Sequence, residues 1–271
     1  MALKFSCSLT FLFTEVPFLE RFERAAAAGF QAVEYMFPYD YEIPAIRERL
    51  ERFGLQQALF NLPAGNWEAG DRGIAVDPDR RREFREGVLR AVEVAEQLNC
   101  PRLNCLVGKR REDLSYGDQW AVLVENLQYA ADVVGRTGRT LLVEPLNTYD
   151  VPGFFLTTTR EALRLLEEVG HPALKLQYDV YHMQRMEGNL TQTLRTHLAR
   201  IGHIQIADVP DRHQPGTGEI NFAFLLRELD RLGYDGYVGL EYIPLGGSEA
   251  SLCWMEEMGF SRGRRSSLRS E

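Results

Sequence analysis

The sequence has few cysteines, no long hydrophobic run and no excess of positive charge. Its 271 residues include only four cysteines, Cys7, Cys100, Cys105 and Cys253, and no two of them form a CxxC pair. We therefore expect reduced thiols in a reducing cytoplasm rather than a disulfide framework. No apolar run approaches the ~20 residues of a membrane span, and the first residues lack the basic and apolar segments of a signal peptide. These absences favour a cytoplasmic protein with no membrane partner.

The charge balance is acidic. The formal net charge is −8 at pH 7, with 45% hydrophobic and 26% charged residues, which is typical of a soluble globular protein. A negative chain is a poor partner for nucleic acid, since non-specific binding depends on Lys and Arg at the phosphates. A small anionic substrate is still compatible, because a local positive pocket can lie inside an acidic surface. Homo-oligomerisation is compatible with the composition as well.

Strand-like and helix-like segments alternate along the chain. Eight such pairs in strict order predict a parallel sheet closed into a single-domain (β/α)8 TIM barrel, a fold of about 250 residues. We assign the barrel to residues 1–260. The basic, Ser-rich tail 261–271 is expected to be disordered, because it cannot bury enough apolar surface to fold. The expected strands are 4–8, 31–35, 55–61, 102–107, 140–144, 174–179, 201–208 and 236–241, and the expected helices are 18–28, 43–53, 80–98, 120–134, 159–169, 189–199, 222–232 and 248–258.

Oxygen-bearing side chains stand at or near the ends of four consecutive predicted strands. Because all strands of a parallel barrel point the same way, these side chains should meet at one rim. Carboxylates with a neutral amide oxygen form a hard site that suits Mg²⁺ or Mn²⁺. The residues are Glu144, Asp179, Gln205 and Glu241.

Two alternatives stay open at this stage. Each acid alone could instead cap a helix or pair with an arginine. Gln205 lies inside its strand, so Asp208 competes with it as a ligand, and His182, His203 or His213 could also substitute.

Four further residues lie in loops near the same rim. Lys109 and Arg212 could hold a substrate carboxylate, an arginine through two parallel hydrogen bonds. Asp150, six residues beyond Glu144, and His182, three beyond Asp179, are further candidates at this rim. For each basic residue the alternative is a solvated loop charge. Glu34 and Asn61 end the second and third predicted strands and could also face the mouth.

The motifs around these residues resemble the hydroxypyruvate isomerase family of xylose isomerase-like barrels, from Phe5 to Met255. The stretches that carry the resemblance are 33–40 (VEYMFPYD), 61–65 (NLPAG), 104–109 (NCLVGK), 144–147 (EPLN), 177–188 (QYDVYHMQRMEG) and 215–221 (PGTGEIN). The resemblance implies that Glu144, Asp179, Gln205 and Glu241 bind the metal and that Glu144 and Glu241 exchange protons with the substrate. It also implies that His182, Arg212 and Asp150 contact substrate oxygens. Related ketose 3-epimerases have a histidine at the position of Gln205, so the glutamine favours the hydroxypyruvate branch.

The implied reaction interconverts hydroxypyruvate and tartronate semialdehyde (2-hydroxy-3-oxopropanoate) through an enediolate, in glyoxylate metabolism. One glutamate removes a proton from the hydroxyl-bearing carbon, and the other returns one to the former carbonyl carbon. A 2-oxo-tetronate isomerase, or another oxo-acid or ketose isomerase or epimerase of the same superfamily, would use the same ligands. Two other classes are a metal-dependent nuclease, which needs a histidine-rich metal cluster where this chain has five histidines in all, and a non-catalytic sugar-acid sensor.

Overall fold

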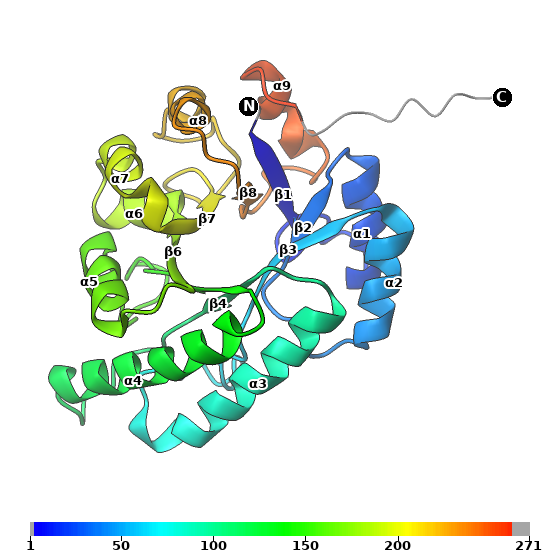
Figure 1. Cartoon of the computed structure of the whole chain (residues 1–271). Coiled ribbons are helices and arrows are strands. Elements are labelled where there is room, and N and C mark those ends of the chain that lie inside the picture. Colours follow the sequence, from blue (N-terminus) through cyan, green and yellow to red (C-terminus); the bar gives the residue numbers. More distant parts are fainter. Residues whose placement is uncertain (1–2, 262–271) are drawn as a thin grey trace.

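The computed structural model describes residues 3–261, and these form a closed barrel of parallel strands in the order β1 to β8 (Figure 1). Each strand pairs with its neighbour in sequence, and β1 pairs with β8 to close the ring. The structure confirms the predicted (β/α)8 class. The strands are β1 (Lys4–Ser8), β2 (Ala32–Glu34), β3 (Gln56–Asn61), β4 (Arg102–Cys105), β5 (Thr140–Val143), β6 (Leu174–Asp179), β7 (Ile201–Ile206) and β8 (Tyr237–Leu240).

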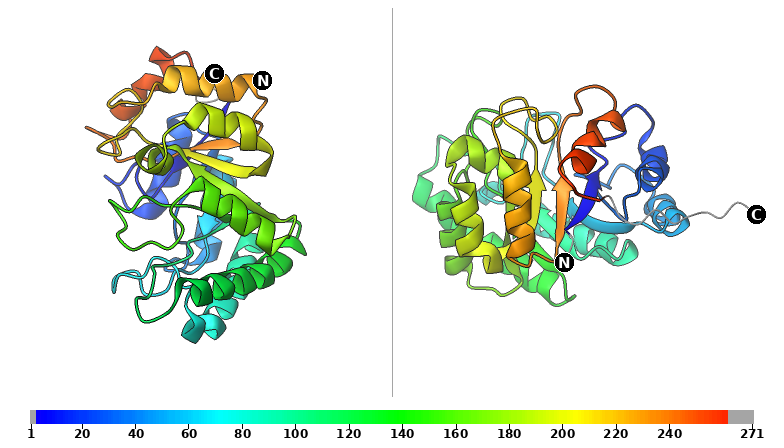
Figure 2. Two further views of the ribbon diagram at one scale, coloured as in Figure 1. Left: turned by 90° about the vertical axis from the view of Figure 1, so that its left-hand side faces the viewer. Right: turned by 90° about the horizontal axis from the view of Figure 1, so that it is seen from above.

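Helices surround the strands (Figures 1 and 2), and their buried faces form the main core against the outside of the barrel. Helix α5 illustrates the local signals, since Thr158 accepts the N–H of Glu161 at its start and Gly170 ends it in the left-handed region. None of the helices within residues 3–261 has the length and apolarity to cross a membrane. The helices are α1 (Phe18–Ala27), α2 (Ile43–Phe53), α3 (Arg81–Gln97), α4 (Tyr116–Gly135), α5 (Thr159–Val169), α6 (Val180–Met186), α7 (Leu190–His197), α8 (Phe222–Arg231) and α9 (Cys253–Glu257), with short 3-10 turns η1 (Pro78–Arg80), η2 (Leu198–Arg200) and η3 (Ala250–Leu252).

Several boundaries differ from the sequence prediction. Helix α4 starts four residues earlier than expected, because Ser115 accepts the N–H of Asp118 and caps it. The additional helix α6 starts directly after β6. Strand β7 ends at Ile206 instead of continuing to residue 208, and the expected helix 248–258 is divided into η3 and α9. Of the predicted tail, residues 262–271 lie outside the described part of the chain.

Alternation along the strands places a polar layer inside the barrel. Side chains of a strand point in turn to opposite faces, and the hydrogen bonds from His203 and Gln205 on β7 to Glu34 on β2 cross the barrel and so mark the inward face. Ser6 bonds Glu34, Asn104 bonds Glu144, and Gln177 bonds Gln205. The intervening strand residues face the helices and are apolar or cysteine. The barrel interior near the site is therefore lined with polar side chains, whereas its outer face supplies the hydrophobic core.

Candidate active site and metal centre

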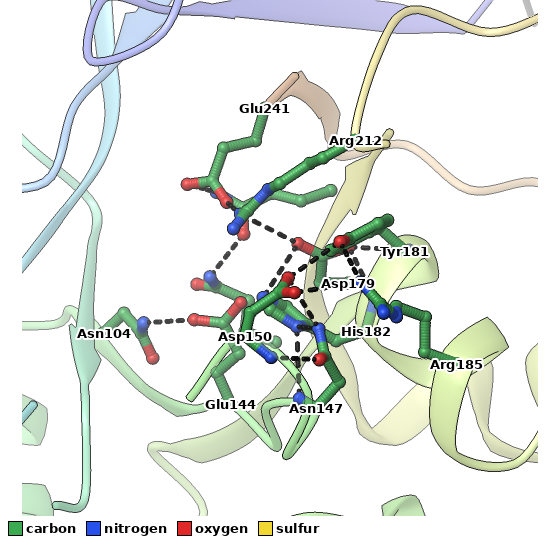
Figure 3. Close-up of polar contacts among 12 residues, drawn as sticks. Asn104, Glu144, Asn147, Asp150, Asp179, Tyr181, His182, Arg185, Arg212 and Glu241 are labelled. Atoms are coloured by element: carbon green, nitrogen blue, oxygen red, sulfur yellow. Dashed lines mark hydrogen bonds and ion pairs between the residues drawn. The ribbon is translucent and has the colours of Figure 1, made fainter. Parts of the chain in front are cut away.

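Three carboxylates meet at the carboxyl end of the barrel (Figure 3). Glu144 follows β5, Asp179 ends β6 and Glu241 follows β8, and all three are buried. The guanidinium of Arg212 lies between Glu241 and Asp179, bonded to Glu241 Oε2 and 3.8 Å from Asp179 Oδ2. The rings of Phe11 and Tyr181 lie 4.9 and 5.2 Å from this guanidinium. One partly buried cation therefore faces a cluster of acids that needs more positive charge than it supplies.

The pKa values of the three acids reflect this shortage of positive charge. Burial raises the pKa of Glu144 well above its usual range, and the charges of Glu241 and Asp179 raise it further. Burial likewise raises the pKa of Asp179, and that of Glu241 to about 8, against the opposing charge of Arg212. Without a further cation, the cluster therefore tends to hold protons near neutral pH.

Asp179 has a divided role. Its Oδ1 accepts the backbone N–H groups of Tyr181 (2.7 Å) and His182 (3.4 Å) and so caps α6. Its Oδ2 is buried and has no hydrogen-bond partner among the described residues. A buried carboxylate oxygen without a partner is costly. Ligand atoms of Glu144, Asp179 and His182 lie within 4.8 Å of one another, so the two carboxylates are close enough to share a divalent cation.

His182 is held in one tautomer. Its Nδ1 accepts the backbone N–H of Asn147 at 3.1 Å, which leaves the ring proton on Nε2. Burial lowers the pKa of His182 well below its usual value, so the ring is neutral. Nε2 lies 3.8 Å from Asp179 Oδ2. This nitrogen is therefore an N–H donor directed at the cluster rather than a lone pair for a metal.

Gln205 occupies the inward face of β7 beside Asp179, its register partner on β6. Asp208 lies beyond the end of β7, on the opposite parity from Gln205. Its carboxylate accepts backbone N–H groups of the loop that follows, from Val209, Gly216, Gly218 and Ile220. Asp208 therefore organises this loop, and the structure places Gln205 rather than Asp208 next to the acids.

The other predicted residues lie at different distances from the cluster. Asp150 accepts hydrogen bonds from Tyr181 Oη (2.7 Å) and Arg185 (2.9 Å). These bonds hold the Asp150 carboxylate beside the acid cluster but not within it. Lys109 is exposed, forms a β-bridge to Phe154 through its backbone, and makes no ion pair within residues 3–261. The substrate contacts assigned to Asp150 and Lys109 stay predictions.

The three candidate histidines lie in different places in the structure. Only His182 reaches the acids. His203 is bonded to Glu34 at 2.9 Å deeper in the barrel, and His213 is half-buried and bonded to the Ile243 carbonyl.

Sequence reasoning missed the neighbours that orient the acids. Asn104 on β4 donates to Glu144 Oε2 at 2.9 Å and also to Asn61. Arg212 has a left-handed backbone with φ 59°, a conformation that costs a non-glycine residue about 1–2 kcal/mol. Asp208 stabilises it by accepting the N–H of Arg212 at its backbone carbonyl. Such contacts join residues far apart in sequence, and the inward period-2 positions of β4, β6 and β7 were the available signal.

Comparison with known proteins identifies the class. The family model described as xylose isomerase-like TIM barrel matches residues 22–258. The chain belongs to this family. It is 51% identical to the hydroxypyruvate isomerase of Escherichia coli K12, over 94% of this chain and 98% of that protein. It is 43% identical to a 2-oxo-tetronate isomerase of Cupriavidus necator, over 93% of this chain and 97% of the relative.

A solved structure has the same fold throughout. The Brucella melitensis protein described as AP endonuclease, family 2, aligns with a TM-score of 0.92 and 43% identity, over 94% of this chain and 98% of that one. The resemblance predicted from the motifs is confirmed, and the relatives named as isomerases support an enzyme of that class.

Proposed function

We propose that this protein is a metal-dependent isomerase that interconverts hydroxypyruvate and 2-hydroxy-3-oxopropanoate. The observation that carries the proposal is the pair of buried glutamates, Glu144 after β5 and Glu241 after β8, at one acid cluster beside a fixed N–H donor and a partly buried arginine. Its 51% identity to a hydroxypyruvate isomerase supports the substrate.

The residues present fit a divalent cation. Asp179 Oδ2 lacks a partner, and oxygen donors are the ligands that Mg²⁺ or Mn²⁺ prefer. We assign Glu144, Asp179, Gln205 and Glu241 as its ligands. When bound, the ion would supply Lewis acidity toward the substrate's carbonyl and hydroxyl oxygens. His182 is excluded from this ligand set by its tautomer and donates its Nε2–H to a substrate oxygen instead.

The chain's own side chains then move the protons. One of the two glutamates takes a proton from the hydroxyl-bearing carbon of the substrate. The other gives a proton to the former carbonyl carbon, while the hydroxyl proton passes to the former carbonyl oxygen. The charge that develops on these oxygens between the steps faces the Arg212 guanidinium and the His182 N–H. Because the two glutamates and Asp179 interact strongly, they titrate as a set. No redox cofactor is needed, since oxidation of one carbon balances reduction of its neighbour.

The test is proton NMR in D₂O with hydroxypyruvate, with and without EDTA. Deuterium should enter carbon-bound positions of substrate and product only when Mg²⁺ or Mn²⁺ is present. Glu144→Gln and Glu241→Gln should each abolish turnover, while Glu228→Gln, an acid paired with Arg195 and Arg231 on the outer helices, should not. Near-normal activity in either active-site variant would refute the two-base scheme.

The 43% identity to a 2-oxo-tetronate isomerase favours one second candidate, a four-carbon substrate for the same site. Comparison of kcat/KM for the three- and four-carbon acids decides between them. A nuclease is disfavoured because His182 alone of the histidines in residues 3–261 reaches the acids. A sensor would bind without turnover. Cytoplasmic location and homo-oligomerisation stay predictions, which cell fractionation and light scattering test.

A further inference from the structure

A fourth carboxylate lies beneath the cluster. Glu34, at the end of β2, is only 1% exposed. Its Oε2 accepts from Ser6 Oγ at 2.6 Å and from His203 Nε2 at 2.9 Å, and its Oε1 accepts from Gln205 Nε2 at 2.7 Å. A carboxylate paired in this way is an acceptor only. It therefore requires donors from each of its three partners.

This requirement sets the direction of the Gln205 amide. The nitrogen faces Glu34 and also Glu241, whose Oε1 is 3.1 Å away. The amide oxygen accepts from Gln177 Nε2 at 2.6 Å. A flipped amide would place its oxygen against two carboxylate oxygens and its nitrogen against another nitrogen, so the observed direction is the only one that satisfies the network.

The direction of the Gln205 amide also affects the surroundings of Glu144, the other glutamate. Because Gln205 presents an oxygen to Gln177, Gln177 must present its nitrogen, and the Gln177 side chain acts to lower the pKa of Glu144 against the effect of burial. The Glu34 carboxylate, deep in the barrel, thus fixes the direction of the Gln205 amide and, through it, that of the Gln177 amide. Each glutamate to which we assign proton transfer receives an N–H from this polar layer.

The space for Glu34 is made by a glycine. Gly239 on β8 is the register partner of Gln205 on β7 and of Ser6 on β1. A Cβ at Gly239 would collide with Glu34 Oε1 and would lie 2.7 Å from its Cδ. No other side chain type therefore fits at this position while the Glu34 carboxylate occupies the barrel interior.

We infer that Glu34 is a positioning residue, whose buried carboxylate turns the Gln205 amide nitrogen toward Glu241 and its oxygen toward Gln177, and so prepares Gln205 and the two glutamates for the metal and for proton transfer. The inference rests on the proposed function for its kinetic consequences. Its structural part, the direction of the amide, is independent of the substrate.

The experiment compares Glu34→Gln with His203→Gln. Both remove the ion pair, but a glutamine at 203 can still donate to the Glu34 carboxylate and leaves the Gln205 amide fixed. Glu34→Gln should weaken Mn²⁺ binding to the EDTA-treated protein, measured by calorimetry, by about 10–100-fold. It should lower kcat by a similar factor with little change in KM, since Glu34 acts through Gln205 and does not touch the substrate. His203→Gln should leave both quantities near the wild-type values.

Gly239→Ala provides a second perturbation that keeps every functional group and displaces only the Glu34 carboxylate, so it should reproduce the loss of Mn²⁺ affinity. In the wild-type protein itself, both side-chain amide protons of Gln205 should exchange slowly with solvent by ¹⁵N NMR, because both are bonded to buried carboxylates. Fast exchange would overturn the inference even if the variants fail to fold.

Two other results would also overturn it. One is wild-type Mn²⁺ affinity in folded Glu34→Gln or Gly239→Ala protein. The other is an equal loss in His203→Gln, which would assign the effect to the ion pair. If the wild type converts neither acid, the proposed function fails, while Mn²⁺ affinity and amide exchange still decide the role of Glu34.

Discussion

Raising the pH from 5 to 8 should destabilise the metal-free protein. In the folded state burial raises the pKa of Glu241 from its ordinary value of 4.5 to about 8. Between these values the folded state holds a proton that the unfolded state has released, so the free energy of unfolding falls as the pH rises. At about 1.4 kcal/mol for each tenfold change, the full interval corresponds to about 5 kcal/mol. Glu144 and Asp179 shift in the same direction and titrate with it.

The measurement is urea unfolding of EDTA-treated protein at several pH values between 5 and 8. Glu241→Gln should reduce the slope of the curve, because the neutral amide has no proton to release and only Glu144 and Asp179 still contribute. Glu228→Gln should leave the slope unchanged, because Arg231 and Arg195 lower the pKa of Glu228 to about 2, and it is ionised in both states throughout the interval. Its stabilising effect is lost only in strong acid.

A divalent ion should reverse the trend. Ligand carboxylates must lose their protons to bind a metal, so Mn²⁺ affinity should rise with pH across the same interval. A metal at 100 times its Kd adds about 2.7 kcal/mol to the free energy of unfolding, and this gain should be larger at pH 8 than at pH 5. A flat stability curve for the metal-free protein, or metal binding that is independent of pH, would refute the reasoning.

Three further predictions concern single residues. Under native conditions one thiol for each chain, that of the exposed Cys253, should react with Ellman's reagent, and all four should react after unfolding. The other three cysteines are buried, and burial raises the pKa of their thiols. Two or more reactive thiols in the native protein would contradict this. Gly218→Ala should lower Tm by several degrees, at a cost of about 1–3 kcal/mol in the free energy of unfolding. The new Cβ would collide with the Val209 carbonyl oxygen and lie 2.8 Å from Asp208 Oδ1. Gly247→Ala should leave Tm unchanged in the same thermal melt. Asn104→Asp should lower kcat in a steady-state assay by about 10–100-fold, because it replaces the N–H donor to Glu144 with a second carboxylate; unchanged kcat would refute that role.

The sequence was sufficient for the barrel and for the acids at its mouth. Runs such as Thr140–Val143 and Tyr237–Leu240 end beside an acid, and parallel topology brings such ends together without any knowledge of side-chain contacts. Which of Gln205 and Asp208 lies beside the acids could be seen only in the structure. It depends on β7 ending at Ile206 and on a register shift in β6 between Leu176 and Gln177, which alternation in a single chain does not reveal.

The partners across the barrel were also beyond sequence reasoning. Glu34 and His203 are 169 residues apart and appear unrelated in the linear chain. Helix α6 was missed because the prediction took Asp179 as a strand end only, while its Oδ1 also caps the helix that follows. In both cases one carboxylate, Glu34 or Asp179, has a second structural role besides its place at a strand end, and sequence periodicity indicates only the strand end.

The charge balance at the barrel mouth gives a physical reason for a divalent ion in particular. Four carboxylates, Glu34, Glu144, Asp179 and Glu241, lie buried in or above the polar layer. Glu34 is bonded to His203 and Glu241 to Arg212, whose guanidinium is 3.8 Å from Asp179 Oδ2, so Glu144 and Asp179 lack a closely bonded cation. Two buried negative charges can be neutralised by two protons, as the raised pKa values indicate, or by one ion of charge +2. A protonated glutamate cannot act as a base, so a bound divalent ion would keep the acids ionised, as the proposed reaction requires.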